Sequence, residues 1–288
     1  MNGQSPPLAS PHPGVERHED GPSAGTSRSG GRAPEEGIQP LLSVREVTKR
    51  FGGVVAVESL SFDLYPGELT GLIGPNGAGK TTLINLITGV DRPTRGAIWF
   101  AGTRIDSLPP HRIGRMGIAR TFQIVRPFAN LSVLENVAIG AMFGAGGARR
   151  TAHEARQRAA EVLELVGLAG RQQHPAESLP VGDRKRLELA KALAMEPVLL
   201  LLDEVMAGLR PGEMEELMAL VRRVNANGTT VLVIEHVMRV IMGVCRRVIV
   251  LDYGRKIAEG PPAEVTRRPA VIEAYLGKRY AERMRVAE

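Results

Sequence analysis

One glycine-rich segment constrains the fold of this chain more than any other feature. It reads Gly-Pro-Asn-Gly-Ala-Gly-Lys-Thr over residues 74–81 and matches the pattern G-x-x-x-x-G-K-[ST] at every fixed position. An apolar run suited to a buried strand, Leu69–Ile73, precedes the segment, and residues 81–88 can begin a helix. The order of strand, glycine loop and helix predicts an α/β fold that binds phosphate at this loop.

The segment also has the chemistry that a triphosphate requires. Glycines let the backbone wrap a phosphate so that successive N–H groups point inward. The helix N-terminus adds partial positive charge, Lys80 adds a full one, and Thr81 can offer its hydroxyl to Mg²⁺. We therefore expect a nucleoside triphosphate to contact Gly74, Pro75, Asn76, Gly77, Ala78, Gly79, Lys80, Thr81 and Thr82.

Length and composition narrow the class of protein. At 288 residues the chain can bury a substantial core, and its single cysteine, Cys245, excludes an internal disulfide. No apolar run approaches the roughly 20 residues that span a bilayer, and no secretory signal is visible, so we expect a protein that faces the cytosol. The net charge of +6 suits an anionic ligand, a membrane surface or nucleic acid, and does not choose between them. Because no aromatic side chains interleave with the basic clusters, we expect no nucleic-acid partner.

The two ends of the chain differ from its middle. Residues 1–40 are rich in Pro, Gly and Ser and contain no aromatic residue, so they are expected to form a disordered extension. Residues 278–288 are expected to form a basic tail. Just before that tail, residues 261–276 have the pattern of two small surface helices.

Strands and helices alternate through the rest of the sequence. Strand-like runs occur at residues 54–57 and 61–64, and a late helix-like run begins at His236. Two helix-like segments, residues 132–143 and 151–166, interrupt this alternation. The pattern predicts a mostly parallel sheet covered by helices, with a helix-rich insertion.

A second constellation follows the apolar run at residues 198–202. Asp203 and Glu204 stand at the carboxyl end of this strand, where open α/β sheets bind their ligands. We expect Asp203 to hold Mg²⁺ and Glu204 to orient or activate the attacking water. The alternative is a buried strand that ends in two solvated acids, which the matched phosphate loop disfavours.

These ordered motifs resemble those of the nucleotide-binding subunits of ABC transporters, over nearly all of residues 41–277. The resemblance implies a P-loop NTPase of the ABC type that hydrolyses ATP, with an antiparallel β portion and a helical subdomain at about residues 127–196. It places Phe51 on the adenine ring, Gln123 at the metal and the water, and His236 at the γ-phosphate. Gly182, within the signature segment 179–183, would contact the ATP of a facing subunit.

The resemblance also implies partners. In this family two ATPase subunits face each other head to tail beneath membrane permease subunits, on the cytoplasmic face of the inner membrane. The segments at residues 117–123 and 271–277 are similar to those of branched-chain amino-acid importers, which use two different ATPases and a solute-binding protein. Urea, amide and lipopolysaccharide transport ATPases share most of the same motifs, so these cargoes stay open.

Several positions depart from the common family pattern. Pro180 and Asp183 replace Ser and Gln in the signature, and Arg210 replaces an Asp or Asn in the segment after the acid pair. Asp183 adds negative charge near a phosphate site, and Arg210 puts communication between the two ATP sites in doubt.

Two alternatives to an ATP-hydrolysing transport subunit follow. They are a hydrolysis-poor partner subunit and a soluble ABC protein of DNA repair or translation. The second usually carries two cassettes or long coiled coils, and this sequence has one cassette and no heptad array.

Overall fold

The computed structural model describes residues 38–123, 127–145 and 150–276. The predictions for residues 1–37 and 278–288 lie outside the described residues. Among those that are described, no helix is both long enough and apolar enough to cross a membrane.

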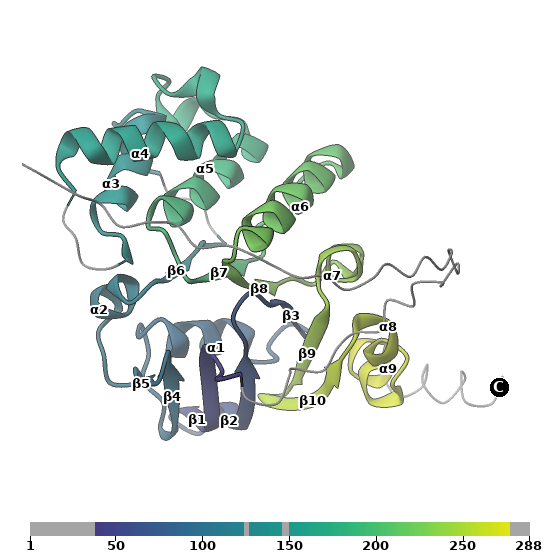
Figure 1. Ribbon diagram of the computed structural model, residues 1–288. Helices are drawn as coiled ribbons and strands as arrows, with labels where there is room; N and C mark the ends of the chain where they lie inside the picture. Colours follow the sequence, from purple (N-terminus) through teal and green to yellow (C-terminus); the bar gives the residue numbers. More distant parts are fainter. Residues whose placement is uncertain (1–37, 124–126, 146–149, 277–288) are drawn as a thin grey trace, which may run out of the picture. The chain divides into compact units, whose positions relative to one another are not determined.

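A six-stranded sheet forms the centre of the described domain (Figure 1). Its strand order is β10-β9-β3-β8-β7-β6, and every neighbouring pair is parallel except β10 with β9. These strands are β3 (Leu69–Ile73), β6 (Ile118–Arg120), β7 (Leu199–Asp203), β8 (Thr230–Ile234), β9 (Arg247–Asp252) and β10 (Arg255–Gly260). The strands β3, β7 and β8 are buried at every position, as expected for parallel strands covered on both faces.

A smaller sheet of four antiparallel strands has the order β2-β1-β4-β5. Its strands are β1 (Leu42–Phe51), β2 (Val54–Leu64), β4 (Arg95–Phe100) and β5 (Thr103–Arg104). The prediction of two separate strands at residues 54–57 and 61–64 was wrong, because β2 is continuous through an irregular register with β1. Ser59 has a φ of 45° at this irregularity, and its N–H donates to Thr48 Oγ1 at 3.0 Å. The polar break in the apolar pattern is therefore a bulge within one strand.

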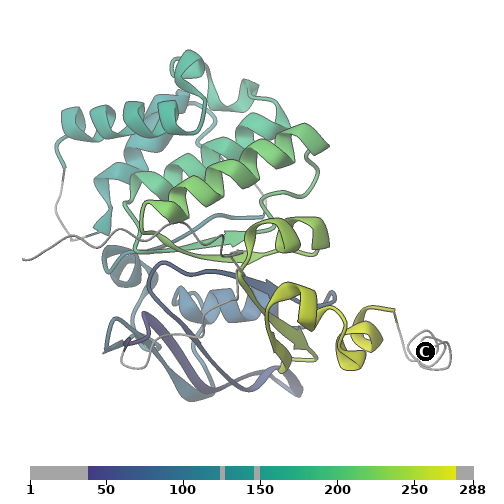
Figure 2. The same cartoon turned by 45° about the vertical axis from the view of Figure 1, so that its right-hand side comes forward.

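Three helices, α3 (Val133–Met142), α4 (Ala152–Leu165) and α5 (Val181–Ala194), pack against one another. They lie side by side in both views (Figures 1 and 2). Capping boxes start α3 and α4, with Ser132 bonded to Glu135 and Thr151 to Glu154. These helices account for the helix-like patterns that interrupt the strand–helix alternation.

The remaining helices cover the central sheet or connect its strands. They are α1 (Lys80–Ile87), α2 (Pro110–Arg115), α6 (Pro211–Ala226), α7 (Met238–Val244), α8 (Pro262–Val265) and α9 (Pro269–Leu276), with 3₁₀ turns at Ala169–Arg171 and Ala176–Ser178. The prediction that a helix begins at His236 was wrong by two residues, because α7 begins at Met238 and leaves His236 in the connection from β8. The two C-terminal helices are not purely superficial, since Val265 and Val271 are buried in the core.

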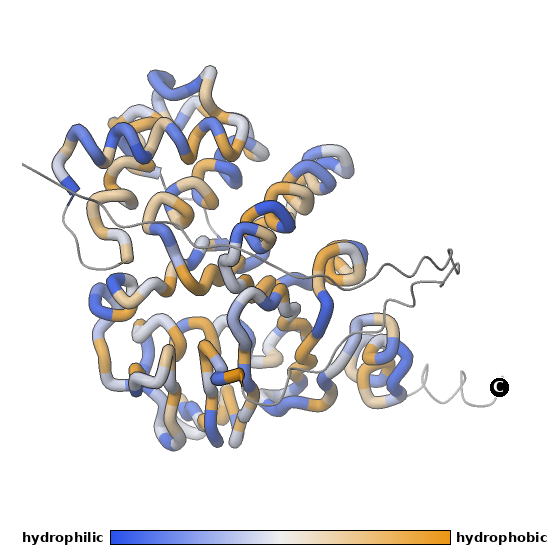
Figure 3. Tube along the Cα trace, in the orientation of Figure 1, coloured by the Kyte–Doolittle hydropathy of each residue, from blue (hydrophilic) through white to orange (hydrophobic). Residues whose placement is uncertain are grey.

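Apolar residues concentrate along the central strands and on the helix faces that cover them (Figure 3). Leu200 and Leu202 of β7 belong to one buried cluster, together with the apolar faces of α3 to α6. Leu199 and Leu201, which point to the opposite face of the same strand, belong to a second cluster shared with α1 and the smaller sheet. The strand β7, like its neighbour β8, thus contributes side chains to the cores on both faces of the central sheet.

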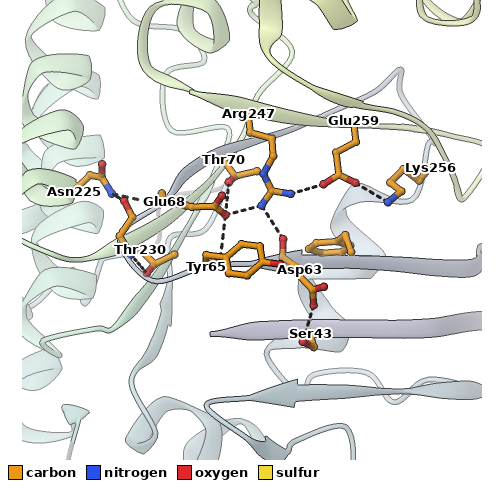
Figure 4. Close-up of polar contacts among 12 residues, drawn as sticks. Ser43, Asp63, Tyr65, Glu68, Thr70, Asn225, Thr230, Arg247, Lys256 and Glu259 are labelled. Carbon is orange, nitrogen blue, oxygen red and sulfur yellow. Dashed lines mark hydrogen bonds and ion pairs between the residues drawn. The ribbon is translucent and has the colours of Figure 1, made fainter. Parts of the chain in front are cut away.

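Polar side chains clamp the two sheets together at the amino end of β3 (Figure 4). Arg247 of β9 donates to Glu68 at 2.5 Å and to the backbone oxygen of Asp63 at 2.7 Å, and it also pairs with Glu259. Asp63 belongs to β2 and Glu259 to β10, so one guanidinium bridges strands of both sheets. This clamp lies at the opposite end of β3 from the phosphate loop.

Candidate functional site

The glycine-rich segment forms a tight loop between β3 and α1. Gly79 has a φ of 98°, and a Cβ there would lie 2.4 Å from the backbone oxygen of Ala56. A Cβ on Gly74 would lie 2.2 Å from the backbone oxygen of Leu251. Both positions therefore require glycine, because the loop passes directly against β2 and β9. Asn76 and Gly77, in the middle of the loop, are exposed.

Lys80 is buried at the start of α1, and its side chain bonds to the loop itself. Its Nζ donates to the backbone oxygens of Gly74 at 2.7 Å and Pro75 at 3.0 Å. Burial lowers the pKa of Lys80, whereas the neighbouring Glu204 and Asp203 raise it. The ammonium is thus held inside the loop, facing the carboxylates at the end of β7. Thr81 and Thr82 follow in the first turn of α1, with Thr81 exposed.

Asp203 is the last residue of β7 and is buried. Its backbone N–H donates to Thr121 Oγ1 at 3.1 Å, and its carboxylate pairs with the Arg120 guanidinium at 3.4 Å. Burial raises the pKa of Asp203, and the charge of Arg120 opposes that rise. Arg120 also donates to Asn85 on α1 at 2.8 Å, so it links the carboxylate to the helix of the phosphate loop.

Glu204 follows in a conformation that is unusual for a side-chain-bearing residue. Its φ is 49°, in the left-handed region that costs a residue with a Cβ about 1 kcal/mol. Gln123 Nε2 donates to Glu204 Oε2 at 2.6 Å, and His236 Nδ1 lies 3.7 Å from Glu204 Oε1. Three residues predicted for the site, from three different segments, therefore meet at one carboxylate. Strained backbone of this kind is typical of functional sites.

A pocket of about 490 Å³ opens beside these groups. Its lining residues are Thr81, Arg120, Phe122, Gln123, Glu188, Lys191 and Asp203. It brings together the three residues predicted for Mg²⁺, which are Thr81, Gln123 and Asp203. A hydroxyl, an amide and a carboxylate provide oxygen donors, which Mg²⁺ prefers. Within the described ranges no cluster of three or more His, Cys, Asp or Glu could hold a metal alone, and Mg²⁺ in phosphate sites needs only one or two carboxylates.

Two predicted residues lie away from this pocket. Phe51 sits at the turn between β1 and β2 with 48% of its surface exposed, and its ring faces Lys49 Nζ at 4.6 Å from the ring centre. Gly182 lies in the first turn of α5, where a Cβ would approach Glu213 Oε1 to 2.9 Å. Neither residue lines the pocket that holds Asp203.

The residues that depart from the family pattern have partners within the chain. Asp183 pairs with Arg171 at 3.1 Å, so its negative charge is partly neutralised. Arg210 pairs with Glu213 at 3.1 Å, although its side chain is 85% exposed. Because Glu213 also lies against Gly182, one carboxylate connects the signature segment with the segment that carries Arg210.

Sequence reasoning missed three charged residues that support this site. They are Arg120, described above, Lys185 on α5, and Glu235 at the end of β8. Glu235 is fully buried, and its Oε1 accepts the N–H of Met206 at 2.9 Å. Burial raises the pKa of Glu235 to about 7. Its position beside His236 at a strand end was a usable signal, whereas nothing in the sequence distinguishes Lys185 from the two basic residues that flank it.

Comparisons with known proteins identify the family of this chain. The ABC transporter family model matches residues 57–207, and a model described as branched-chain amino acid ATP-binding cassette transporter matches residues 255–281. The high-affinity branched-chain amino acid transport ATP-binding protein LivG of Escherichia coli (strain K12) is 42% identical over 252 residues, which cover 83% of this chain and 99% of LivG.

Solved structures agree as well. The ADP conformation of MJ1267, an ATP-binding cassette of an ABC transporter, matches with a TM-score of 0.76 and 31% identity, over 83% of this chain and 100% of that one. A dimeric post-hydrolysis structure of the cassette MJ0796 bound to ADP and Pi matches with a TM-score of 0.70 and 29% identity, over 77% and 98%. The α/β fold of the ABC type is thereby confirmed. This chain belongs to the ABC transporter family, as one of its ATP-binding cassettes.

Proposed function

We propose that this chain is the ATP-hydrolysing subunit that energises an importer of branched-chain amino acids. The observation that carries the proposal is the meeting of Gln123, Glu204 and His236 beside a complete phosphate loop. The cargo class is supported by the similarity to LivG along nearly its full length and by the separate C-terminal match.

In this proposal the loop at residues 74–82 binds the phosphates of ATP. Its backbone N–H groups and the N-terminus of α1 face the phosphates, and Lys80 contributes a full positive charge. Mg²⁺, held by Thr81, Asp203 and Gln123, would offset phosphate charge. Phe51 would stack on the adenine, which its exposed ring at the β1–β2 turn allows.

Hydrolysis in this proposal depends on the Glu204 carboxylate. It orients and activates the water that attacks the γ-phosphate, and the amide of Gln123 fixes its direction through the 2.6 Å hydrogen bond. His236 lies on the other side of the carboxylate, where its ring can contact the γ-phosphate. Donors held in advance around the reacting groups lower the barrier without reorganisation.

The partners follow from the same proposal. Gly182 would complete the ATP site of a facing cassette, so the working unit contains two ATPase subunits. We propose a second, different ATPase as that partner, membrane permease subunits that dock on the helix-rich part, and a solute-binding protein outside. The chain would act at the cytoplasmic face of the inner membrane. The dimer of the related cassette MJ0796 supports pairing in general.

Reconstitution tests the proposal. The chain is assembled in proteoliposomes with the permeases, second ATPase and binding protein encoded beside it, and ATP hydrolysis and uptake of labelled leucine are measured. We expect leucine-stimulated hydrolysis and uptake, and loss of both in Glu204→Gln with ATP binding retained. Glu215→Gln, which changes a carboxylate of α6 that pairs with Arg239 of α7, is the matched control and keeps both activities.

Three outcomes of this experiment would contradict different parts of the proposed function. Near-normal turnover in Glu204→Gln would remove this residue from the catalytic role. Hydrolysis stimulated by urea or an amide, and not by leucine, would overturn the cargo. A wild-type complex that binds ATP without turnover would identify the chain as a hydrolysis-poor partner subunit.

A further inference from the structure

Lys185 is a buried lysine without a counter-ion at bonding distance. It lies in the second turn of α5, directly after the signature segment 179–183, and only 8% of its surface is exposed. Within the part of the chain that the structure describes, it forms no ion pair, although Asp203 and Glu235 lie within electrostatic range. A buried ammonium is costly unless hydrogen bonds satisfy it, so its contacts have a structural reason.

Those contacts are two backbone oxygens of the candidate site. Lys185 Nζ donates to the backbone oxygen of Gln123 at 3.2 Å and to that of Glu204 at 3.3 Å. The side chains of Gln123 and Glu204 are joined to each other by the 2.6 Å hydrogen bond. The three residues therefore form a closed ring, in which one ammonium holds two backbones whose side chains meet.

The backbone that Lys185 holds is the strained one. Glu204 has a φ of 49°, and its N–H donates to the backbone oxygen of Ile234 at 2.9 Å. Two residues on, the N–H of Met206 is held by Glu235. An uncommon backbone conformation persists only where surrounding contacts define it. Of these three residues that hold the backbone of residues 204–206, Ile234 and Glu235 lie at the end of β8. Lys185 is the one that lies on α5.

We infer that Lys185 is a positioning residue that couples the signature helix α5 to the direction of the Glu204 carboxylate. The inference rests on the proposed function and deepens it. A rotation of α5 relative to β7 must carry or break the two hydrogen bonds of Lys185. The rate of hydrolysis in this subunit's own site then depends on the position of α5 relative to β7. In the proposed pair, the signature segment at the start of α5 contacts the ATP of the facing subunit.

The test compares three variants in the assembled complex. Lys185→Met keeps most of the length of the side chain and removes its donors, and Lys185→Leu removes the donors with a shorter side chain. Lys185→Gln restores N–H donors without the charge. Arg186→Met is the matched control, because Arg186 is the next residue on α5 and also binds a backbone oxygen, that of Val166 at 3.0 Å, away from the site.

We expect Lys185→Met and Lys185→Leu to lower kcat by at least about tenfold, since small misplacements of a catalytic group have large effects on rate. The affinity for ATP should stay within about twofold. Lys185→Gln should recover most of the rate, and Arg186→Met should keep it. Hydrogen exchange of a peptide covering residues 199–210 should be faster in the Met and Leu variants than in the wild type and the control.

Three results on turnover would overturn the inference. They are an unchanged kcat in both donor-free variants, a loss of rate matched by an equal loss of ATP affinity, and an equal loss in Arg186→Met. Unchanged hydrogen exchange in residues 199–210 would do so as well, independently of turnover. A wild-type complex without ATPase activity would instead refute the proposed function, and the exchange measurement would still decide the role of Lys185.

Discussion

Burial and two neighbouring carboxylates have opposite effects on the pKa of Lys80. Burial disfavours its charge, and the facing Asp203 and Glu204 favour it. Lys80→Ala deletes the charge that would face the β- and γ-phosphates and also frees the oxygens of Gly74 and Pro75. We expect the affinity for ATP to fall by well over about tenfold, as for the loss of a strong charge-assisted contact. Titration with a fluorescent ATP analogue measures this, and an affinity within about twofold of the wild type would contradict the loop assignment.

Glu235 makes the stability of the fold depend on pH. Burial raises the pKa of Glu235 from its ordinary value of 4.5 to about 7, against the favourable influence of the Met206 N–H and of the nearby His236 and Lys185. The charge of Glu204 acts in the same direction as burial. The native state therefore binds this proton more tightly than the unfolded chain, and the stability it contributes is complete below pH 4.5 and is lost as the pH rises through about 7.

Glu235→Gln should remove that dependence. The amide oxygen can still accept the N–H of Met206, and no charge has to be buried at high pH. We expect the Tm of the variant, relative to the wild type, to rise between about pH 5 and about pH 8. Glu215→Gln, on the surface of α6, should show no such trend. A parallel pH dependence of Tm in Glu235→Gln and the wild type would contradict the role of this carboxyl.

At the scale of single residues, the sequence predicted the members of the site better than their supports. The glycine loop, Asp203, Glu204, Gln123 and His236 stand in motifs with fixed spacing, so their identity could be read from the pattern. Lys185 and Arg120 act through contacts between segments far apart in the chain, such as the 3.4 Å pair of Arg120 with Asp203. Such contacts depend on packing and have no local signature.

Among the elements, the smaller sheet and the central sheet are joined by the clamp around Arg247. Its guanidinium lies between Glu68 and Glu259, and its Nη2 also donates to the backbone oxygen of Asp63. Arg247→Met leaves the partly buried Glu68 without its cation, close to Glu259, which keeps its ion pair with Lys256. We therefore expect the free energy of unfolding to fall by roughly 3 kcal/mol. Arg255→Met, which breaks the exposed pair with Glu58, is the control and should have a much smaller effect.

Urea unfolding at neutral pH measures both variants. A second comparison, Arg247→Met combined with Glu68→Gln, should recover part of the loss because it removes the carboxylate that lost its cation. An Arg247→Met variant as stable as the wild type would show that the clamp contributes nothing to the joining of the sheets.

The elements themselves were predictable in proportion to their length and regularity. The buried strands β3 and β7 are continuous apolar runs, and the helix α4 is amphipathic. The predicted bounds of β3 equal the observed ones, and those of β7 and α4 differ from them by one residue at each end. The short β6, of three residues, was not predicted because it is too short for a periodic pattern. β2 was divided at Glu58 and Ser59, because a bulge stabilised by Thr48 cannot be told from a strand end by hydropathy alone.

At the scale of the whole molecule, the proposed head-to-tail pair would give this chain only part of each composite site. Gly182 does not line the pocket that contains Asp203, so in that pair it would serve the ATP of the facing cassette. The charges that depart from the family pattern are paired internally, Asp183 with Arg171 and Arg210 with Glu213. Asp183 therefore presents less repulsion to a facing phosphate than its charge alone implies.

Arg210 has a different consequence, because its side chain is largely exposed beside the signature segment. Two copies of this chain facing each other would bring two such cations to the same interface, whereas a different partner with an Asp or Asn at that place would offset one of them. We therefore expect low ATPase activity from the chain alone, and activity higher by on the order of tenfold or more after assembly with a second cassette and the permeases. Arg210→Asp should raise the ATPase activity of the chain alone by favouring self-pairing. Arg239→Asp, also on an exposed part of the surface, is the control.

The measurement is ATP hydrolysis by the purified chain, by each variant, and by the assembled complex in a bilayer. Full activity from the isolated wild-type monomer, unchanged by its partners, would favour a self-sufficient soluble ATPase, since a composite site cannot act before closure brings its halves together.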